Sequence, residues 1–196
     1  MRAVTVVSAA VSARLFSSAL AAASILAFLL AGQADGGTRA SSAYLAPAGS
    51  CASAGDASAP AAAQSRAITC LVNWARAQER RSRLVQRPRL ERASELKGQR
   101  VAACGQLSHT PCGVDVTAAV REAGYPYGVF GENLFVGTWG KDSARDVVAA
   151  WLASPPHRAI ILGRQFRHLG AAPTRAPGLL GSSDAVVWTA TFASPR

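Results

Sequence analysis

The distribution of large apolar residues constrains the fold most, because it divides the chain at about residue 65. Before that point alanine, serine, glycine and proline dominate, and after it large apolar residues recur at regular spacing as far as the C-terminus. The chain of 196 residues therefore offers about 130 residues from which a hydrophobic core can be built. This length suits one domain, and we expect no second one.

The first 34 residues have the features of an export signal. Arg2 gives a positive start, and residues 15–31 form an uncharged, mostly apolar run. Small residues such as Gly32 and Ala34 follow, before a polar segment, which is the pattern that a signal peptidase reads. We expect residues 1–34 to be a signal peptide cleaved near Ala34. The alternative is an uncleaved N-terminal anchor, for which a run of about 17 residues is short.

Residues 35–65 contain few large apolar side chains, so we expect a flexible Ala/Ser/Gly-rich tail. The four cysteines are an even number in a chain that carries an export signal, which favours disulfides. Three pairings are possible. Cys104 and Cys112 flank a short loop and are the natural local pair, which leaves Cys51 to join the tail to Cys70. No pair has the spacing of a zinc knuckle, which argues against a cysteine zinc site.

The formal net charge of +10 favours contact with anionic surfaces such as nucleic acid, acidic lipid or cell-wall polymers. The densest group of basic residues, nine of the 21, lies between Arg76 and Arg100, where glutamates are interspersed at helical spacing. A solvated helix face explains this pattern more simply than a dedicated binding patch. No aromatic residue interleaves with the basic ones, so we expect no nucleic-acid partner.

Apolar spacing predicts four helices, of which the fourth has the clearest ends. Ser143 and Asp146 form an acidic variant of a capping box at its start, and the pair Pro155-Pro156 ends it. Ser65 is the expected cap of the first helix, and Pro88 suits the first position of the second. The four predicted helices cover residues 65–81, 88–101, 116–120 and 143–154.

Alternating apolar residues predict three strands, at residues 132–136, 169–172 and 185–192. The last is the clearest, because Val186, Trp188, Ala190 and Phe192 lie on one side. Helices come first, then a strand, another helix and two strands. This order favours an α+β fold in which helices pack on a small antiparallel sheet.

The three histidines and one Glu-Asn pair are the candidates for chemistry. His109 lies in a predicted loop, His157 follows the fourth helix, and Glu132-Asn133 begins a strand between them. Two imidazoles and a carboxylate form a metal or acid-base set if the fold brings them together. By spacing alone, a hydrogen bond from each histidine to nearby backbone is the simpler explanation.

Several of these segments stand in the order found in the bacterial branch of the CAP superfamily, which the chain resembles over about 125 residues. That superfamily comprises the cysteine-rich secretory, antigen 5 and pathogenesis-related proteins. The resemblance implies a three-layer α-β-α sandwich over residues 66–196. The matching segments are Leu71-Val72-Asn73 with Arg76, Ser108-His109-Thr110, Ala123-Gly124-Tyr125, Gly131-Glu132-Asn133-Leu134, Ala150-Trp151-Leu152 through Ser154-Pro155 and His157-Arg158 to Ile161-Leu162, Phe166 with Leu169-Gly170, and Trp188 with Phe192.

The resemblance also implies a cleft in which His109, Glu132 and His157 hold a divalent metal such as zinc or calcium. One expected ligand is missing, because animal and plant relatives place a second glutamate shortly after the residue that matches Trp151, and no carboxylate follows it here. Bacterial relatives often lack this glutamate too, so the departure concerns the metal affinity and leaves the fold unaffected. For Asn133 we expect a hydrogen bond to backbone that orients the cleft.

Two more residues depart from the pattern of the bacterial relatives. Pro156 stands where they usually have glycine, and it stiffens the approach to His157. His168 stands where they usually have an acidic or polar residue.

These residues suggest three functions. The first is a secreted or cell-surface CAP-domain protein that binds a cell-wall polymer, a lipid or another protein through the His/Glu cleft. The second is a hydrolase, in which a metal-bound water or His157 acts as the base with Glu132 as its partner. The third is a structural extracellular domain with a vestigial cleft. A binding role without catalysis is the expectation, and a membrane is a partner only if the N-terminal segment stays uncleaved.

Overall fold

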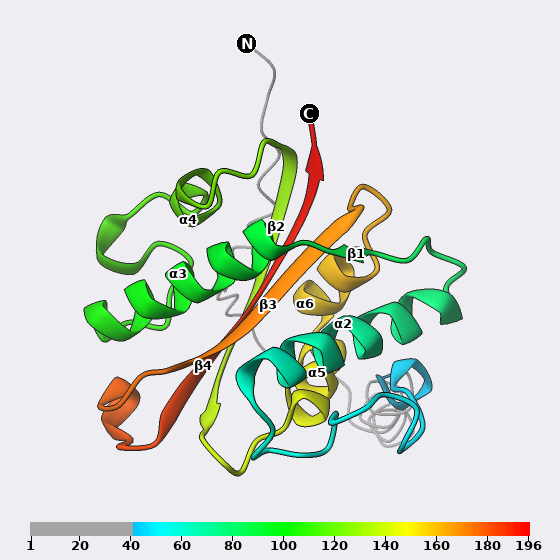
Figure 1. Cartoon of the computed structure of the whole chain (residues 1–196), viewed down its shortest axis with the longest axis horizontal. Helices are drawn as coiled ribbons and strands as arrows, with labels where there is room; N and C mark the ends of the chain where they lie inside the picture. Colours follow the sequence, from blue (N-terminus) through cyan, green and yellow to red (C-terminus); the bar gives the residue numbers. More distant parts are fainter. Residues whose placement is uncertain (1–40) are drawn as a thin grey trace, which may run out of the picture.

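The structure is a computed structural model that describes residues 41–196, and the expected signal peptide lies outside the described residues. Four strands and several helices follow one another along this part of the chain (Figure 1). In chain order they are α2 (Ala61–Gln78), β1 (Val85–Gln86), α3 (Pro88–Cys104), η1 (Pro111–Gly113), α4 (Ala118–Glu122), β2 (Tyr127–Thr138), α5 (Ala144–Ala153), α6 (Pro155–Ile161), β3 (His168–Arg175), η2 (Leu179–Gly181) and β4 (Ala185–Pro195).

The strands form one sheet in the order β1-β3-β4-β2. β4 runs antiparallel to both β3 and β2, while the short β1 is parallel to β3. β2 is therefore an edge strand, and side chains from both faces of the sheet can meet beside it. This position matters for the site described below.

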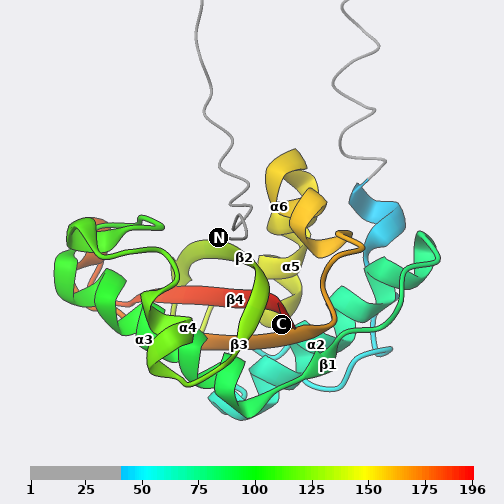
Figure 2. The same ribbon diagram turned by 90° about the horizontal axis from the view of Figure 1, so that it is seen from above.

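Helices cover both faces of the sheet, which gives three layers (Figures 1 and 2). α2, α5 and α6 pack on one face, where the largest core lies, and α3 and α4 pack on the other. β4 is buried on both sides, and the alternation seen in the sequence places one set of its residues in the largest core. The α+β class and the α-β-α sandwich are thus confirmed. The four core residues of β4 are Val186, Trp188, Ala190 and Phe192.

Residues 46–60 pack against the domain, although the sequence predicted a flexible tail. Ala46 and Cys51 are only 0% and 5% exposed and belong to the same core as α2 and α5. A disulfide joins Cys51 to Cys70 on α2, and the Arg145 guanidinium donates a 2.7 Å hydrogen bond to the Ala46 carbonyl. Small side chains let this segment lie close to the helices, so its low hydrophobicity does not mean disorder.

The ends of two predicted helices differ from the structure. α2 begins at Ala61, so Ser65 is a buried residue inside it and does not cap it. Pro155 ends α5 as predicted, but it also takes the first position of α6, a helix that the sequence analysis did not anticipate. Proline is well suited to a first helical turn, so a Pro-Pro pair can end one helix and begin the next.

The capping box of α5 is confirmed, because Ser143 and Asp146 exchange hydrogen bonds between their side chains and backbone N–H groups. Pro88 opens α3 as predicted. All three predicted strands are present and longer than expected, and the short β1 was missed.

No helix within residues 41–196 is long and apolar enough to cross a membrane.

Candidate functional site

Glu132 and Asn133 lie next to each other on the edge strand β2 and point to opposite faces of the sheet. Glu132 faces the α3 layer, where it contacts Lys97, and Asn133 faces the α6 layer, where it contacts His157. Gly131 precedes them, and a side chain there would lie 2.7 Å from the Phe166 ring. The Gly-Glu-Asn order therefore lets β2 pack closely on one side while it presents a carboxylate on the other.

His109 lies in the loop between α3 and η1 and reaches Glu132 from the α3 side. The disulfide Cys104–Cys112 closes this loop. The Nδ1 atom of His109 lies 2.8 Å from Oε1 of Glu132. The Lys97 ammonium donates a 2.5 Å hydrogen bond to the His109 carbonyl. Both the backbone and the ring of His109 are thus held in place.

Lys97 is the site residue that the sequence analysis missed. Its Nζ lies 3.3 Å from Oε1 of Glu132, and both side chains are only 3% exposed. A signal for it was present, because Lys97 falls on the same helical stripe as Leu90, Ala93 and Val101, which are all buried. A lysine on the buried stripe of a helix needs a carboxylate partner, since an unpaired buried charge is costly.

His157 lies on α6, on the opposite layer from His109. Its carbonyl accepts a 3.1 Å hydrogen bond from the Asn133 side chain, so Asn133 bonds to backbone as expected. Arg76, which is 1% exposed, donates to the carbonyls of Ile161 and Gly163 and so fixes the end of α6. α6 therefore reaches the edge of β2 in a defined orientation.

The electrostatics keep His157 neutral near pH 7. Burial lowers the pKa of the half-buried His157, and the nearby His109 lowers it further. His157 contacts Asn133 and His109 contacts its neighbour Glu132, so both histidines lie at the same edge strand. The structure thus brings His109, Glu132 and His157 to one edge of the sheet, and we call these three residues the His–Glu site.

The geometry of the His–Glu site does not fit the three-ligand metal centre that the family resemblance implied. Within residues 41–196, no group of three or more histidine, cysteine, aspartate or glutamate side chains is arranged to hold a metal ion. The Lys97 ammonium already lies beside the Glu132 carboxylate, where it would repel a divalent cation. Metal binding through His109, Glu132 and His157 stays a prediction, and Lys97 is its specific obstacle.

The hydrogen bond from His109 to Glu132 determines which ring nitrogen carries the proton. An ionised carboxylate can only accept, so Nδ1 of neutral His109 donates, and Nε2 keeps its lone pair. The hydrolase hypothesis paired Glu132 with His157, whereas the structure pairs it with His109. Ser108 Oγ accepts a hydrogen bond from the Thr110 backbone N–H. This bond does not activate the hydroxyl as a nucleophile.

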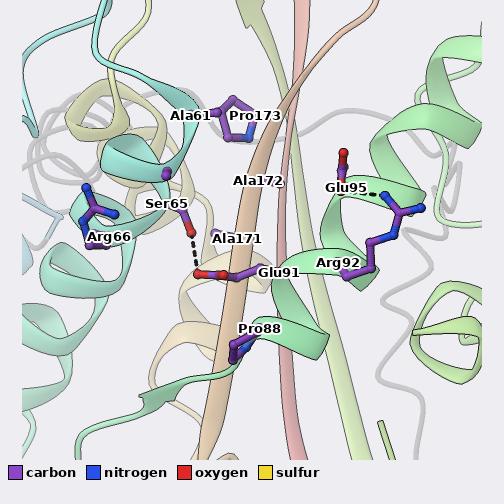
Figure 3. Close-up of a pocket in the computed structure, with 11 residues that line it drawn as sticks. Ala61, Ser65, Arg66, Pro88, Glu91, Arg92, Glu95, Ala171, Ala172 and Pro173 are labelled. Carbon is purple, nitrogen blue, oxygen red and sulfur yellow. Dashed lines mark hydrogen bonds and ion pairs between the residues drawn. The ribbon is translucent and has the colours of Figure 1, made fainter. Parts of the chain in front are cut away.

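An open cavity near the surface lies elsewhere, between α2 and α3 across β3 (Figure 3). It has a volume of about 390 Å³ and contains no histidine. Its polar side chains pair with one another, since Ser65 donates to Glu91 and Arg92 binds Glu95. We assign no chemistry to this cavity, because both of its carboxylates, Glu91 and Glu95, are already paired.

An α-β-α sandwich with two histidines and the glutamate of a Gly-Glu-Asn segment at one edge strand is the arrangement expected for a CAP domain. The model of the cysteine-rich secretory protein family, CAP, matches residues 69–192. The chain therefore belongs to that family, and the resemblance seen in the sequence is confirmed. A search of curated proteins found no match.

Three solved structures share the fold at low sequence identity. An extracellular protein containing an SCP domain from Bacillus anthracis str. Ames has a TM-score of 0.54 at 18% identity, over 69% of this chain and 41% of that chain. An outer surface protein from Borrelia burgdorferi has a TM-score of 0.56 at 16% identity, over 66% of this chain and 90% of that chain. A cysteine-rich secretory protein from Staphylococcus aureus subsp. aureus Mu50 has a TM-score of 0.53 at 13% identity, over 68% and 38%. The match thus spans less than half of the Bacillus and Staphylococcus proteins.

Proposed function

We propose that this CAP-domain protein acts outside the cell, secreted or bound to the surface, and works by binding a ligand at the His–Glu site. Two of the structural relatives are described as an extracellular protein and an outer surface protein, which supports this location. The two disulfides support it as well, because such bonds persist in oxidising compartments.

The observation that carries the proposal is the contrast between an exposed imidazole and its buried anchor. The His109 side chain is 53% exposed, whereas Glu132 and Lys97 are each 3% exposed. A half-exposed ring held by a buried ion pair loses little conformational freedom when a ligand arrives. This preorganisation is typical of a binding group and is unnecessary for a purely structural histidine.

The same geometry indicates what the ligand offers. The Nε2 lone pair of His109 accepts a hydrogen bond, and neutral His157 adds one donor and one acceptor. Hydroxyl and amide groups match these atoms, so a sugar chain of a cell-wall polymer or a peptide segment is the proposed ligand class. Binding needs no metal, because Lys97 already supplies the positive charge beside Glu132.

Sedimentation with insoluble peptidoglycan tests this proposal. We expect the native protein to sediment with the polymer, and we expect the double variant His109→Ala/His157→Ala to stay in solution. The matched control is His168→Ala, which removes the third histidine and leaves the His–Glu site intact. Equal sedimentation of all three proteins would mean that the His–Glu site is not the binding site. Phosphatidylcholine vesicles test the lipid alternative in the same assay.

A hydrolase is the second candidate, and one observation favours it. The pairing of Glu132 with Nδ1 of His109 is the arrangement that orients an imidazole as a general base. The base could act on a water molecule, because no activated serine lies beside it. Turnover of peptide and ester libraries, with and without added zinc, tests this activity. Turnover that is lost in His109→Ala but kept in His168→Ala would support it.

A further inference from the structure

A second cluster of polar side chains lies away from the His–Glu site, where α3 begins beside β3. An open cavity of about 370 Å³ is bounded there by two arginines, two prolines and a tyrosine. No acidic residue lines it. The lining residues are Arg87, Pro88, Arg89, Tyr125 and Pro126.

The positive charge around this cavity is not neutralised. Within the described part of the chain, neither Arg87 nor Arg89 has an acidic group within salt-bridge distance; the one hydrogen bond described for Arg89 goes to the Gly124 carbonyl, at 2.9 Å. Arg167 is near enough to lower the pKa of His168, after burial and Arg87. Two guanidinium groups, those of Arg87 and Arg89, therefore line this cavity without a carboxylate, and their positive charge favours the binding of an anion.

A chain of hydrogen bonds holds one of these arginines in place. The Arg87 guanidinium lies 3.1 Å from Nε2 of His168 and can only donate, so Nε2 accepts. The proton of neutral His168 is then on Nδ1, which donates to the Tyr125 hydroxyl oxygen. Tyr125 is only 7% exposed, and its ring packs edge-on against the His168 ring at a centroid distance of 5.9 Å.

The direction of this chain leaves donors for a ligand. Tyr125 accepts from His168, so its own O–H hydrogen is free to donate. Arg87 uses one of its five N–H groups on His168, and Arg89 uses one on Gly124. A guanidinium with several free N–H groups binds carboxylate or phosphate oxygens in a bidentate manner.

We propose that Arg87, Arg89 and Tyr125 form a binding site for an oxyanion that is carried on an apolar body. The oxyanion contacts the two guanidinium groups, and the apolar body packs against Pro88, Pro126 and the Tyr125 ring. His168 acts as a positioning residue that holds Arg87. This site is separate from the His–Glu site. It binds a negatively charged group, whereas the His–Glu site binds neutral hydroxyl and amide groups.

NMR titration of the native protein with phenyl phosphate tests the site, followed on the Arg Nε–H signals and the His168 ring. We expect saturable shifts of Arg87, Arg89 and His168, and binding weaker by about tenfold or more in Arg87→Ala/Arg89→Ala, which removes two charge-assisted contacts. Inorganic phosphate should bind more weakly than phenyl phosphate, because it lacks the apolar body. His109→Ala/His157→Ala should bind phenyl phosphate like the native protein.

The matched control is Arg66→Ala/Arg92→Ala, which removes the same charge from the rim of the other cavity. An equal loss in this control would overturn the proposal, because net charge alone would then explain binding. Equal affinity for phenol and phenyl phosphate would overturn it as well, as would the absence of saturable shifts in the native protein. If the alanine variant does not fold, Arg87→Gln/Arg89→Gln serves the same purpose.

Vesicles distinguish two sources of the oxyanion. Retention on phosphatidylglycerol vesicles that is lost in Arg87→Ala/Arg89→Ala would assign the site to a lipid headgroup. Phenyl phosphate binding without such retention would assign it to a soluble ligand or a polymer.

Discussion

At the scale of single residues, the buried pair of Lys97 and Glu132 distinguishes this site. Both charges are removed from water, which is tolerable because each has a partner, and Lys97 also bonds to the His109 carbonyl. The Glu132 carboxylate in turn orients the exposed ring of His109. Lys97 thus helps to position His109 through its carbonyl and through Glu132.

Replacing Lys97 should destabilise the protein strongly. In Lys97→Met the Glu132 carboxylate is left buried without a cation, so we expect a loss of about 3–5 kcal/mol in the free energy of unfolding. Lys97→Met/Glu132→Gln should recover part of it. Arg92→Met is the control, because its pair with Glu95 is exposed and should contribute less than about 1 kcal/mol. Urea unfolding measures all three variants, and a loss in Lys97→Met no larger than in the control would show that Lys97 does not stabilise buried Glu132.

His168 should make stability depend on pH. Burial, Arg87 and Arg167 lower its pKa in the folded state, and Tyr125 bonds to its neutral form. The unfolded chain therefore takes up the proton first, so stability falls as the pH drops below about 6.5, until the folded form is protonated as well. His157 contributes in the same direction.

In His168→Gln one of these two contributions disappears. Thermal unfolding between about pH 7.5 and 5.5 should therefore show a smaller loss of Tm than in the native protein. An identical loss in both proteins would show that His168 does not have the lowered pKa.

At the scale of elements, the position of α6 decides whether the two histidines meet. Arg76 fixes the end of α6 through the carbonyls of Ile161 and Gly163, and it also bonds to the Ser82 carbonyl at 2.8 Å. Burial lowers the pKa of Arg76 to about 10, which still leaves it charged at neutral pH. An arginine on α2 thus positions a histidine on another helix.

Replacing Arg76 should disturb both stability and the site. Arg76→Met leaves three backbone carbonyls without their donor, so we expect a loss of about 3 kcal/mol or more in the free energy of unfolding. The ring signals of His157 should shift as well, because α6 is released. Arg66→Met is the control. It changes an exposed arginine of the same helix and should leave the free energy of unfolding and the His157 ring signals unchanged. An unshifted His157 in Arg76→Met would show that Arg76 does not position α6.

The elements that the sequence predicted are those with a local signal. The capping box of Ser143 and the alternation along β4 each lie within a few residues, and both were found as expected. α6 was missed because the pair Pro155-Pro156 predicts the end of a helix. Only the tertiary structure shows that the same pair also begins the next helix. The histidines and Glu132 could be predicted from the family resemblance, whereas the pairing of Lys97 with Glu132 joins residues far apart in the chain.

At the scale of the whole molecule, two disulfides of the expected pairing tie irregular segments to the sandwich. Cys51–Cys70 attaches the segment before α2 to the core, and Cys104–Cys112 closes the loop that carries His109. The first therefore concerns the stability of the domain, and the second concerns the site.

Removing the two disulfides separately should give different results. Cys51→Ala/Cys70→Ala opens the longer loop, with a sequence separation of 19 against 8, and should cost about 3 kcal/mol. Cys104→Ala/Cys112→Ala should cost less but broaden the NMR signals of His109. Thermal unfolding and NMR of both variants check this. Unchanged His109 signals in Cys104→Ala/Cys112→Ala would show that this disulfide does not hold the His109 loop.

Nitrogen-15 NMR of the imidazole rings tests whether Glu132 holds His109 with a free Nε2 lone pair. In the neutral form of His109 we expect the proton on Nδ1 and an unprotonated Nε2. A proton on Nε2, or the tautomer mixture of a free imidazole, would contradict it, because His109 would then present no fixed acceptor to a ligand.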